Sequence, residues 1–253
     1  MDPSQLKDFL DEKAAAYNRP TFIAADPIQV PHRFNQKEDI EIAAFLTAAI
    51  AWGNRKGIIK NAASIMERMG NSPFDFVVHF TEKKHAGALS GFVHRTFNSG
   101  DLIYFVKALQ FIYKNEGGLE AIFNKHKTET SLQPAISVLK QVFFSLPHLP
   151  RTQKHLGDPL KNSAAKRTNM FLRWMVRKDN NGVDFGIWET LPPRLLSCPL
   201  DVHTGNVARK LNLITRKQND AKTLAQLDAA LRAMDAEDPV KYDFALFGLG
   251  ACE

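Results

Sequence analysis

Residues 163–213 read SAAKRTNMFLRWMVRKDNNGVDFGIWETLPPRLLSCPLDVHTGNVARKLNL and contain two helical patterns joined by a turn-rich segment. Apolar residues at the i, i+4 spacing give the first pattern a stripe that would face a core. These residues are Met170, Phe171, Trp174 and Met175. The tripeptide 180–182, Asn-Asn-Gly, then ends the first helix, because these residue types tolerate left-handed backbone geometry.

Basic residues occupy a second stripe of this helix. Lys166 and Arg173 are seven positions apart, which is about two helical turns, so their side chains should point the same way. Arg177 continues the stripe one turn later. The sequence thus predicts a helix with one apolar face and one cationic face.

A second helix is predicted to begin at Asp201, which closely follows Pro199. The residues after the aspartate include apolar side chains at positions that suit a helix. They are Val202, Val207, Ala208 and Leu211. Aspartate is a preferred N-cap, because its carboxylate accepts hydrogen bonds from free N–H groups of the first turn. We therefore expect the Asp201 carboxylate to lie at the mouth of a basic helix.

Both segments resemble the helix-hairpin-helix superfamily of DNA glycosylases. Residues 200–213, LDVHTGNVARKLNL, are similar to the segment in which a proline-preceded aspartate opens a helix of that superfamily. Residues 165–177, AKRTNMFLRWMVR, are similar to the lysine-bearing helix of one branch, the archaeal 8-oxoguanine glycosylases. The resemblance implies that Lys166 is the catalytic lysine and Asp201 the catalytic aspartate. Nearly the whole chain also resembles an uncharacterised bacterial family, described as a domain of unknown function (DUF2400), which implies kinship without an activity.

The implied reaction gives each of these two residues a role. Removal of a base followed by strand cleavage calls for an amine that attacks the anomeric carbon, and a lysine amine attacks only when it is deprotonated. Neighbouring positive charge favours the neutral amine, and Arg167 and Arg173 would supply it. A carboxylate stabilises the cationic sugar and relays protons, which is the role implied for Asp201. Without the motif, Lys166 would be an exposed surface lysine and Asp201 an ordinary helix cap.

The turn after the first buried helix carries a further implied contact with DNA. Residues 47–56, TAAIAWGNRK, resemble the turn from which the superfamily inserts a Gln or Asn into the space left by the flipped base. Asn54 matches that amide, and Arg55 follows it. A side chain inserted there offsets part of the unstacking cost, which is roughly a few kcal/mol per step. Asn54 is otherwise a residue type that favours turns.

Three more residues are candidates for the base pocket or for DNA binding. Asp243 and Phe247 have the i, i+4 spacing of an aspartate and an aromatic ring that contribute to the base pocket in the archaeal branch. His203 follows Asp201 by two positions and would contact a phosphate or the flipped nucleotide. Each also has an ordinary interpretation, in which His203 and Asp243 are solvated and Phe247 belongs to the core.

The rest of the sequence predicts helices throughout. Residues 2–3, Asp-Pro, start a first helix, and residues 35–38 resemble a capping box in front of a largely buried one. Residues 99–118 form a strongly apolar helix that ends at two glycines. Prolines make 18–34 extended or irregular, and 71–98 give a short helix followed by a polar linker. No convincing strand is found, so we expect an all-α fold.

The expected architecture is a single glycosylase-like unit, 1–253, with two helical lobes around a cleft. One lobe would comprise 36–145 and carry the turn described above. The other would comprise 1–35 together with 146–253 and carry both catalytic residues.

Residues 146–162, rich in proline and basic residues, lead into the helix of Lys166. A helix-hairpin-helix would grip phosphate here, through N–H groups at a helix start and nearby cations. The superfamily's usual hairpin, Leu-Pro-Gly-x-Gly, is missing from this segment. The expectation therefore depends on an irregular hairpin.

The composition agrees with a DNA partner. Of 253 residues, 44% are apolar, which is enough for a sizeable core. Thirty-three basic against 27 acidic residues give a net charge of +6, which favours a polyanionic partner. Two cysteines, Cys198 and Cys252, are too few for an iron–sulfur cluster, which takes about four thiolates. No histidine or carboxylate cluster has metal-site spacing, so we expect no metal and no cofactor.

The sequence also bears on location and assembly. No apolar run is long enough to span a bilayer, and the first residues show no leader pattern. We therefore expect a cytoplasmic, nucleoid-associated protein of a bacterium that has no membrane partner and acts as a monomer.

Together these features predict a DNA glycosylase with AP lyase activity. It would flip an oxidised purine, with 8-oxoguanine as the expected lesion, out of double-stranded DNA and into the cleft. Lys166 would attack, and β-elimination would follow. Two alternatives remain open. One is a non-catalytic helical protein that binds nucleic acid through the same basic face, and the other is a glycosylase without lyase action in which Asp201 activates water.

Overall fold

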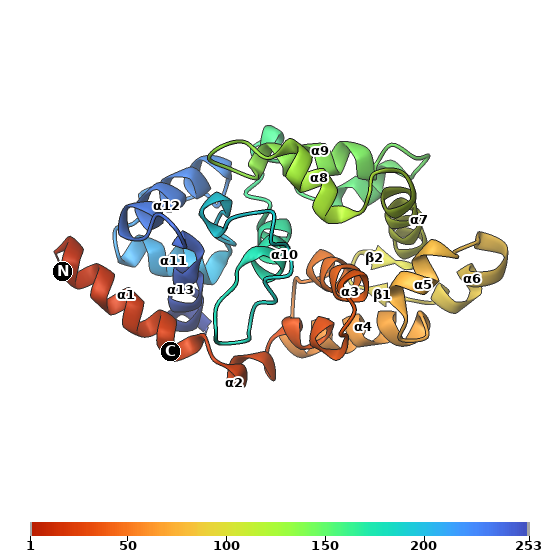
Figure 1. Cartoon of the computed structure of the whole chain (residues 1–253), viewed down its shortest axis with the longest axis horizontal. Coiled ribbons are helices and arrows are strands. Elements are labelled where there is room, and N and C mark those ends of the chain that lie inside the picture. The colour runs from red at the N-terminus through yellow and green to blue at the C-terminus, as the bar shows by residue number, and fades with distance from the viewer. Residues whose placement is uncertain (1, 252–253) are drawn as a thin grey trace.

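The computed structural model describes residues 2–251, which form thirteen α-helices, six short 3-10 helices and one two-stranded hairpin. The all-α fold class is therefore confirmed. The α-helices are α1 (Pro3–Tyr17), α2 (Pro20–Ile23), α3 (Lys37–Ala49), α4 (Arg55–Arg68), α5 (Pro73–Val78), α6 (Glu82–Leu89), α7 (Ser99–Asn115), α8 (Leu119–His126), α9 (Gln133–Phe143), α10 (Lys166–Val176), α11 (Val202–Lys210), α12 (Ala221–Met234) and α13 (Tyr242–Ala251). Figure 1 shows α10 in the middle, with α3–α9 on one side and α1 and α11–α13 on the other.

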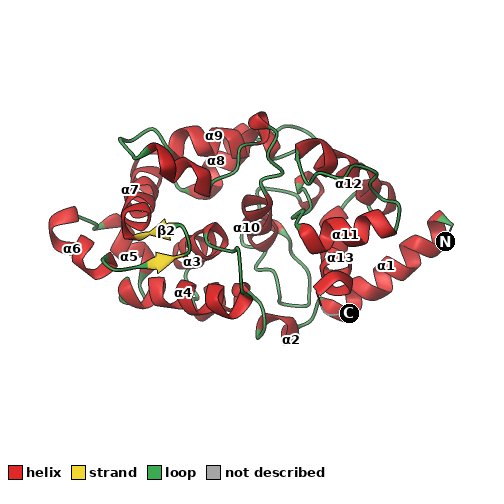
Figure 2. Ribbon diagram, turned by 180° about the vertical axis from the view of Figure 1, so that it is seen from behind, coloured by secondary structure: helices red, strands yellow, loops and turns green. Residues whose placement is uncertain are grey.

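Short elements connect these helices. The strands β1 (Val93–His94) and β2 (Phe97–Asn98) form an antiparallel hairpin that lies next to α7 (Figure 2). The 3-10 helices are η1 (Pro27–Gln29), η2 (Pro31–Arg33), η3 (Pro150–His155), η4 (Pro159–Lys161), η5 (Pro193–Leu195) and η6 (Pro239–Lys241). Within residues 2–251, no helix has both the length and the apolar character needed to cross a membrane.

Helices α3 and α10 pack together at the centre of the larger core. Most of α3 is buried because its side chains are apolar on nearly every side and neighbouring helices cover them. Phe45 of α3 meets Phe171 of α10 edge to face, with 5.4 Å between the ring centroids. The buried Glu41 accepts hydrogen bonds from the Tyr113 hydroxyl at 2.6 Å and from Trp188 Nε1 at 2.7 Å, so its carboxyl does not stay unpaired in the core. The contact between Phe45 and Phe171 thus joins α3 to α10.

The buried apolar residues form two clusters. The larger cluster joins α3, α4, α7 and α9 to the apolar side of α10, and the smaller one joins α1, α11, α12 and α13. Phe171 and Trp174 of α10 belong to the larger cluster, as the predicted apolar stripe requires. Because α10 contributes its core face to the helices of the first half of the chain, the clusters do not follow the predicted lobe bounds. Those bounds stay a prediction.

Two predicted helix boundaries are confirmed at the level of individual hydrogen bonds. Asp2 caps α1 with a complete capping box, in which its carboxylate accepts from Gln5 N and the Gln5 side chain accepts from Asp2 N. Helix α7 ends just before Gly117 and Gly118, whose φ angles of 77° and 96° lie in the left-handed region. Glycine adopts this region without the steric cost that a Cβ atom brings.

The prediction that 18–34 is extended or irregular was wrong. The three prolines of this segment, Pro20, Pro27 and Pro31, each begin a short helix, namely α2, η1 and η2. Proline suits the first helical position because its missing N–H would be unpaired there and its φ angle is already helical. The prolines therefore start turns of helix, and the chain folds back on itself several times within this segment.

Two further expectations need correction. The apolar helix α3 begins after Gln36 without a side-chain cap, so the capping box at 35–38 does not form. In the first turn of α3, the Asp39 carboxylate accepts a hydrogen bond from Phe74 N of α5 at 2.8 Å. The expected polar linker contains α6 and the β1–β2 hairpin, because Leu89, Phe92 and Phe97 are apolar enough to be buried.

Helices α1 and α13 cross closely at Gly248, where a Cβ atom would lie 2.3 Å from the Tyr17 ring. We expect Gly248→Ala to lower the free energy of unfolding by about 1–3 kcal/mol, because the ring or the helices must move apart. Gly87→Ala on α6 is the matched control, since a Cβ atom there meets nothing within 4 Å. It should raise stability by up to about 1 kcal/mol, because alanine favours helix. Urea unfolding measures both changes, and an equal response at the two sites would contradict the prediction.

Candidate active site

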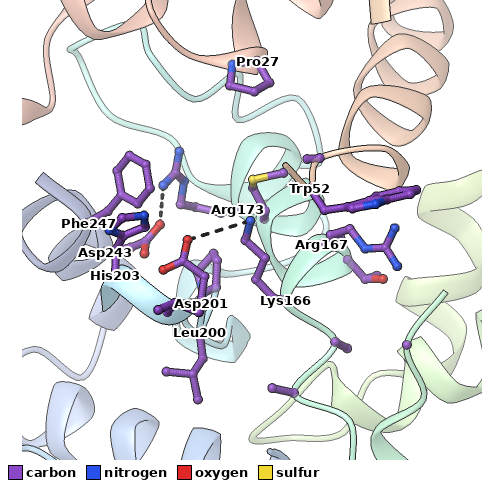
Figure 3. Close-up of a pocket in the computed structure, with 18 of the residues that line it drawn as sticks. Pro27, Trp52, Lys166, Arg167, Arg173, Leu200, Asp201, His203, Asp243 and Phe247 are labelled. Carbon is purple, nitrogen blue, oxygen red and sulfur yellow. Dashed lines mark hydrogen bonds and ion pairs between the residues drawn. The ribbon is translucent and has the colours of Figure 1, made fainter. Parts of the chain in front are cut away.

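A cavity of about 530 Å³ lies where α10, α11, α13 and the start of α4 meet (Figure 3). Eight of the nine site residues predicted from the sequence line this cavity, and Asn54 does not. The eight are Arg55, Lys166, Arg167, Arg173, Asp201, His203, Asp243 and Phe247. The structure therefore brings together side chains from three regions of the sequence that are far apart.

Lys166 is the first residue of α10, and its side chain is 30% exposed in the cavity. The preceding residue, Ala165, has a φ angle of 44°, in the left-handed region that residues with a Cβ atom seldom adopt. This turn of the backbone ends the loop and starts the helix without any side-chain cap. It directs the lysine toward Asp201, whose Oδ2 lies 3.9 Å from the Lys166 Nζ atom (Figure 3).

Asp201 is the N-cap of α11, as predicted. Its Oδ1 accepts a hydrogen bond from Thr204 N at 2.9 Å, so Oδ2 is left to face the lysine. The backbone carbonyl of Asp201 accepts a second bond, from Asn219 Nδ2 at 2.8 Å. Because both the side chain and the main chain are held, the position of the carboxylate is set by the fold.

Arg173 lines the same cavity as Lys166, but it is buried, so the expectation that its guanidinium looks outward was wrong. Its guanidinium is only 4% exposed and pairs with Asp184 and Asp243. Arg177, the next residue of the predicted stripe, is equally buried and also pairs with Asp184. Asp184, in the segment after α10, and Asp243 of α13 cover this side of the helix. Both arginines are thereby neutralised, so neither is a free cation for DNA.

Asp243 is buried against Arg173 rather than solvated. Burial raises the pKa of Asp243 to about 6, although the positive charge of Arg173 opposes the shift. Its other oxygen, Oδ1, accepts from Cys198 Sγ at 3.6 Å. Both oxygens therefore have protein partners, and the carboxyl forms part of the cavity wall.

Arg167 lies beside Trp52 at another part of the wall. Its guanidinium donates to the carbonyl of Ala49 and lies 4.7 Å from the centre of the Trp52 ring. Burial lowers the pKa of Arg167 to about 10, which still leaves a cation at neutral pH. Arg167 therefore places a positive charge on the cavity wall, where the aromatic ring and the end of α3 fix it.

The predicted pocket aromatic, Phe247, is contacted on several sides. The Arg55 guanidinium lies 5.2 Å from its ring centre, and His203 meets it edge to face. His203 Nδ1 also bonds to the Gly250 carbonyl at 2.8 Å, so the exposed imidazole is held at the rim.

Asn54 is the exposed N-cap of α4, and its side chain accepts a hydrogen bond from Gly57 N at 3.2 Å. Its amide thus has a structural role at the cavity's edge, and its insertion into DNA stays a prediction.

Among the cavity residues that were not identified as site residues from the sequence, four have side chains that could contact a ligand. Asp26 follows α2 in the proline-rich segment that was expected to be irregular. Met170 was assigned wholly to the core but is half-buried at the cavity. Trp52 stands in the quoted turn, and its ring lines the wall. Trp174 is fully buried, and its indole N–H has no hydrogen-bond partner within residues 2–251. The dipeptide Asp26-Pro27 was a usable signal, because Asp-Pro marks a helix start elsewhere in the chain.

The segment 146–162 contains η3 and η4 in place of a regular hairpin. Lys140 Nζ donates to the Leu156 carbonyl at 2.7 Å, and Gly157 lies at the cavity's edge. Phosphate binding at this segment therefore remains a prediction.

Nowhere between residues 2 and 251 do three or more His, Cys, Asp or Glu side chains gather as a metal ion would need.

A comparison with protein families places the chain in one of them. Residues 26–252 match the family described as "Protein of unknown function (DUF2400)", and the chain belongs to that family. The match begins at Asp26 and includes every residue that lines the cavity except Phe22. Neither the curated proteins nor the solved structures gave a match.

Asp228 of α12 supports the segment that leads to Asp201, because its Oδ1 accepts from Cys198 N at 3.0 Å. Burial raises the pKa of Asp228 to about 6. A raised pKa means that the folded protein binds this proton more tightly than the unfolded chain does. In the unfolded chain the pKa of an aspartate is about 3.9. The charged carboxylate therefore costs folding free energy above pH 6, and this cost disappears below about pH 4.

We expect Asp228→Asn to remove this cost while it keeps an oxygen for the Cys198 N–H group. The free energy of unfolding of the variant minus that of the wild type should rise by about 3 kcal/mol between pH 4 and pH 7. Urea unfolding at several pH values measures the difference. Asp8→Asn, the same chemical change at an exposed site on α1, is the matched control. A difference that is constant with pH at Asp228 would contradict the assignment.

Proposed function

We propose that this protein is a DNA glycosylase with AP lyase activity that removes an oxidised purine, such as 8-oxoguanine, from double-stranded DNA. The proposal rests on one observation above all. An amine and a carboxylate, Lys166 Nζ and Asp201 Oδ2, lie 3.9 Å apart in a cavity of about 530 Å³. A cavity of this size is within the usual range for a small organic ligand, and a single nucleobase fits that class.

The proposed chemistry uses the two residues in sequence. The Lys166 nitrogen bonds to C1′ of the flipped nucleotide as the bond from C1′ to the base breaks and its electron pair leaves with the base. The negative charge of Asp201 first stabilises the positive charge that develops on the sugar, and the carboxylate then takes the proton that the substituted amine loses. The nitrogen lone pair then forms a double bond to C1′ as the bond from C1′ to O4′ breaks and O4′ takes a proton, which gives a Schiff base. Loss of a C2′ proton to water expels the 3′ phosphate and cuts the strand, and water then hydrolyses the Schiff base and frees Lys166.

The walls of the cavity support a nucleobase as the occupant. Met170, Trp52 and Phe247 offer apolar and aromatic surface, which suits stacking on a flat ring. The unpaired indole N–H of Trp174 is a buried donor that would gain from an acceptor oxygen on a ligand. The cationic Arg55 and Arg167 flank the cavity, and the net charge of +6 favours a polyanion.

The test is an incubation of purified wild-type protein with a panel of duplexes that each carry one lesion or one abasic site. Cleavage of the 8-oxoguanine strand, together with a covalent adduct after borohydride reduction, is the expected result. Base release without strand cleavage would indicate a glycosylase in which Asp201 activates water. Tight binding without base release or adduct would indicate a non-catalytic DNA-binding protein and would overturn the proposal.

A further inference from the structure

Asp26, which is far from Asp201 in the sequence, places a further carboxyl group in the same cavity. The residue is 8% exposed, and one oxygen, Oδ1, accepts a hydrogen bond from Ile28 N at 3.0 Å. Its second oxygen has no hydrogen-bond partner among the described residues, although the carboxyl lines the cavity. A nearly buried carboxyl with one free oxygen in a cavity is available to a bound molecule.

The electrostatic surroundings of Asp26 are mixed. Burial raises the pKa of Asp26, while the positive charges of Arg173, Arg55 and Lys166 act against the shift. These three side chains come from α4 and α10, the helices that enclose the same cavity. Asp26 therefore lies within electrostatic reach of the amine of Lys166, and it is a carboxyl whose proton is held more tightly than usual.

The proposed reaction needs a proton that the other carboxyl groups of the cavity are poorly placed to give. Asp201 uses Oδ1 as a helix cap, and its Oδ2 faces the amine, whose proton it accepts. Asp243 is engaged by Arg173 on one oxygen and by Cys198 on the other. The departing base still requires a proton, because an unprotonated purine anion is a poor leaving group. Among these three carboxyl groups, Asp26 has the free oxygen.

We propose that Asp26 is a further catalytic residue, the general acid that protonates the base as it leaves; this inference rests on the proposed function. As the Lys166 nitrogen bonds to C1′, the bond from C1′ to the base breaks and its electron pair passes to the base. The Asp26 carboxyl gives its proton to the base, so that a neutral purine leaves. The resulting carboxylate takes a proton back from water before the next turnover.

The test compares two substrates, because an abasic site has no base to protonate. Asp26→Asn keeps an oxygen for the Ile28 N–H group but cannot act as an acid. On a duplex with 8-oxoguanine, we expect base release to fall by about 100-fold or more. On a duplex with an abasic site, strand cleavage and borohydride trapping should stay within about twofold of the wild type. Asp8→Asn, the same chemical change on the exposed part of α1, should leave both reactions unchanged.

The outcomes separate this inference from the proposed function. Equal loss on both substrates would show a structural role for Asp26 and would overturn the inference alone. Unchanged base release in Asp26→Asn would also overturn it, while the lyase chemistry of Lys166 would stand. A wild-type protein that acts on neither duplex would overturn the proposed function and this inference with it.

Discussion

Replacing Lys166 with glutamine is expected to eliminate the covalent adduct with damaged DNA. Glutamine has nearly the length of lysine but no nucleophilic nitrogen, so no Schiff base forms and borohydride has nothing to reduce. We expect trapping and strand cleavage to fall by at least about 1,000-fold, as is usual when a nucleophile is removed. Gel analysis of trapped product on an abasic duplex measures the loss. Stability should change by less than about 1 kcal/mol, because the partly exposed ion pair with Asp201 contributes little.

The control for this variant is Lys83→Gln. Lys83 is exposed and lies on α6, which Figure 1 shows far from α11 and α13, two of the helices that line the cavity. The control removes the same positive charge, so a shared loss of activity would point to net charge rather than to the amine. Full trapping in Lys166→Gln would refute the nucleophile assignment. Retained base release without trapping would leave Asp201 as the activator of a water molecule.

The second large effect is expected from Asp201→Asn, which separates the charge of the residue from its structural role. The asparagine oxygen can still accept the hydrogen bond from Thr204 N, so the cap on α11 should persist. The negative charge that stabilises the sugar cation and accepts the amine proton is lost. We expect the rate of base release to fall by about 100- to 10,000-fold. The melting temperature should change little, and single-turnover kinetics on an 8-oxoguanine duplex give the rate.

Asp201→Ala provides the comparison. Alanine removes the cap as well as the charge, so we expect an additional loss of about 1 kcal/mol of stability with a similar loss of activity. Substantial activity in Asp201→Asn would mean that the carboxylate serves α11 only as a cap. A large fall in stability of the asparagine variant would mean that the charge, and not the cap, holds the helix start.

The parts of the site that depend on short sequence patterns could be predicted. The Asp201 cap needs only Pro199, the aspartate and the helix that follows, and all three are local. The apolar stripe of α10 likewise follows from the i, i+4 spacing of Phe171 and Met175. The distance of 3.9 Å between Lys166 Nζ and Asp201 Oδ2 does not follow from a local pattern. It was expected from the resemblance to a family, because no local rule relates positions 35 residues apart.

The parts that depend on distant partners could not be predicted. Arg173 was expected to face outward, but Asp184 and Asp243 neutralise it, and the spacing of basic residues along one helix carries no information about those partners. The position of Asp26 depends on how a short proline-rich segment folds back against α4. A residue's exposure is a property of the whole fold, so helix periodicity gives the direction of a side chain but not what covers it.

The walls of the cavity come from both ends of the chain, and this has a consequence for how the protein is made. Translation delivers Lys166 and Asp201 well before α13, which supplies Asp243 and Phe247. Until that last helix docks, Arg173 lacks one of its two carboxylate partners and one wall is missing. A polypeptide that lacks α13 therefore holds the amine and the carboxylate without this wall of the cavity. The enclosed form of the cavity therefore depends on the docking of α13.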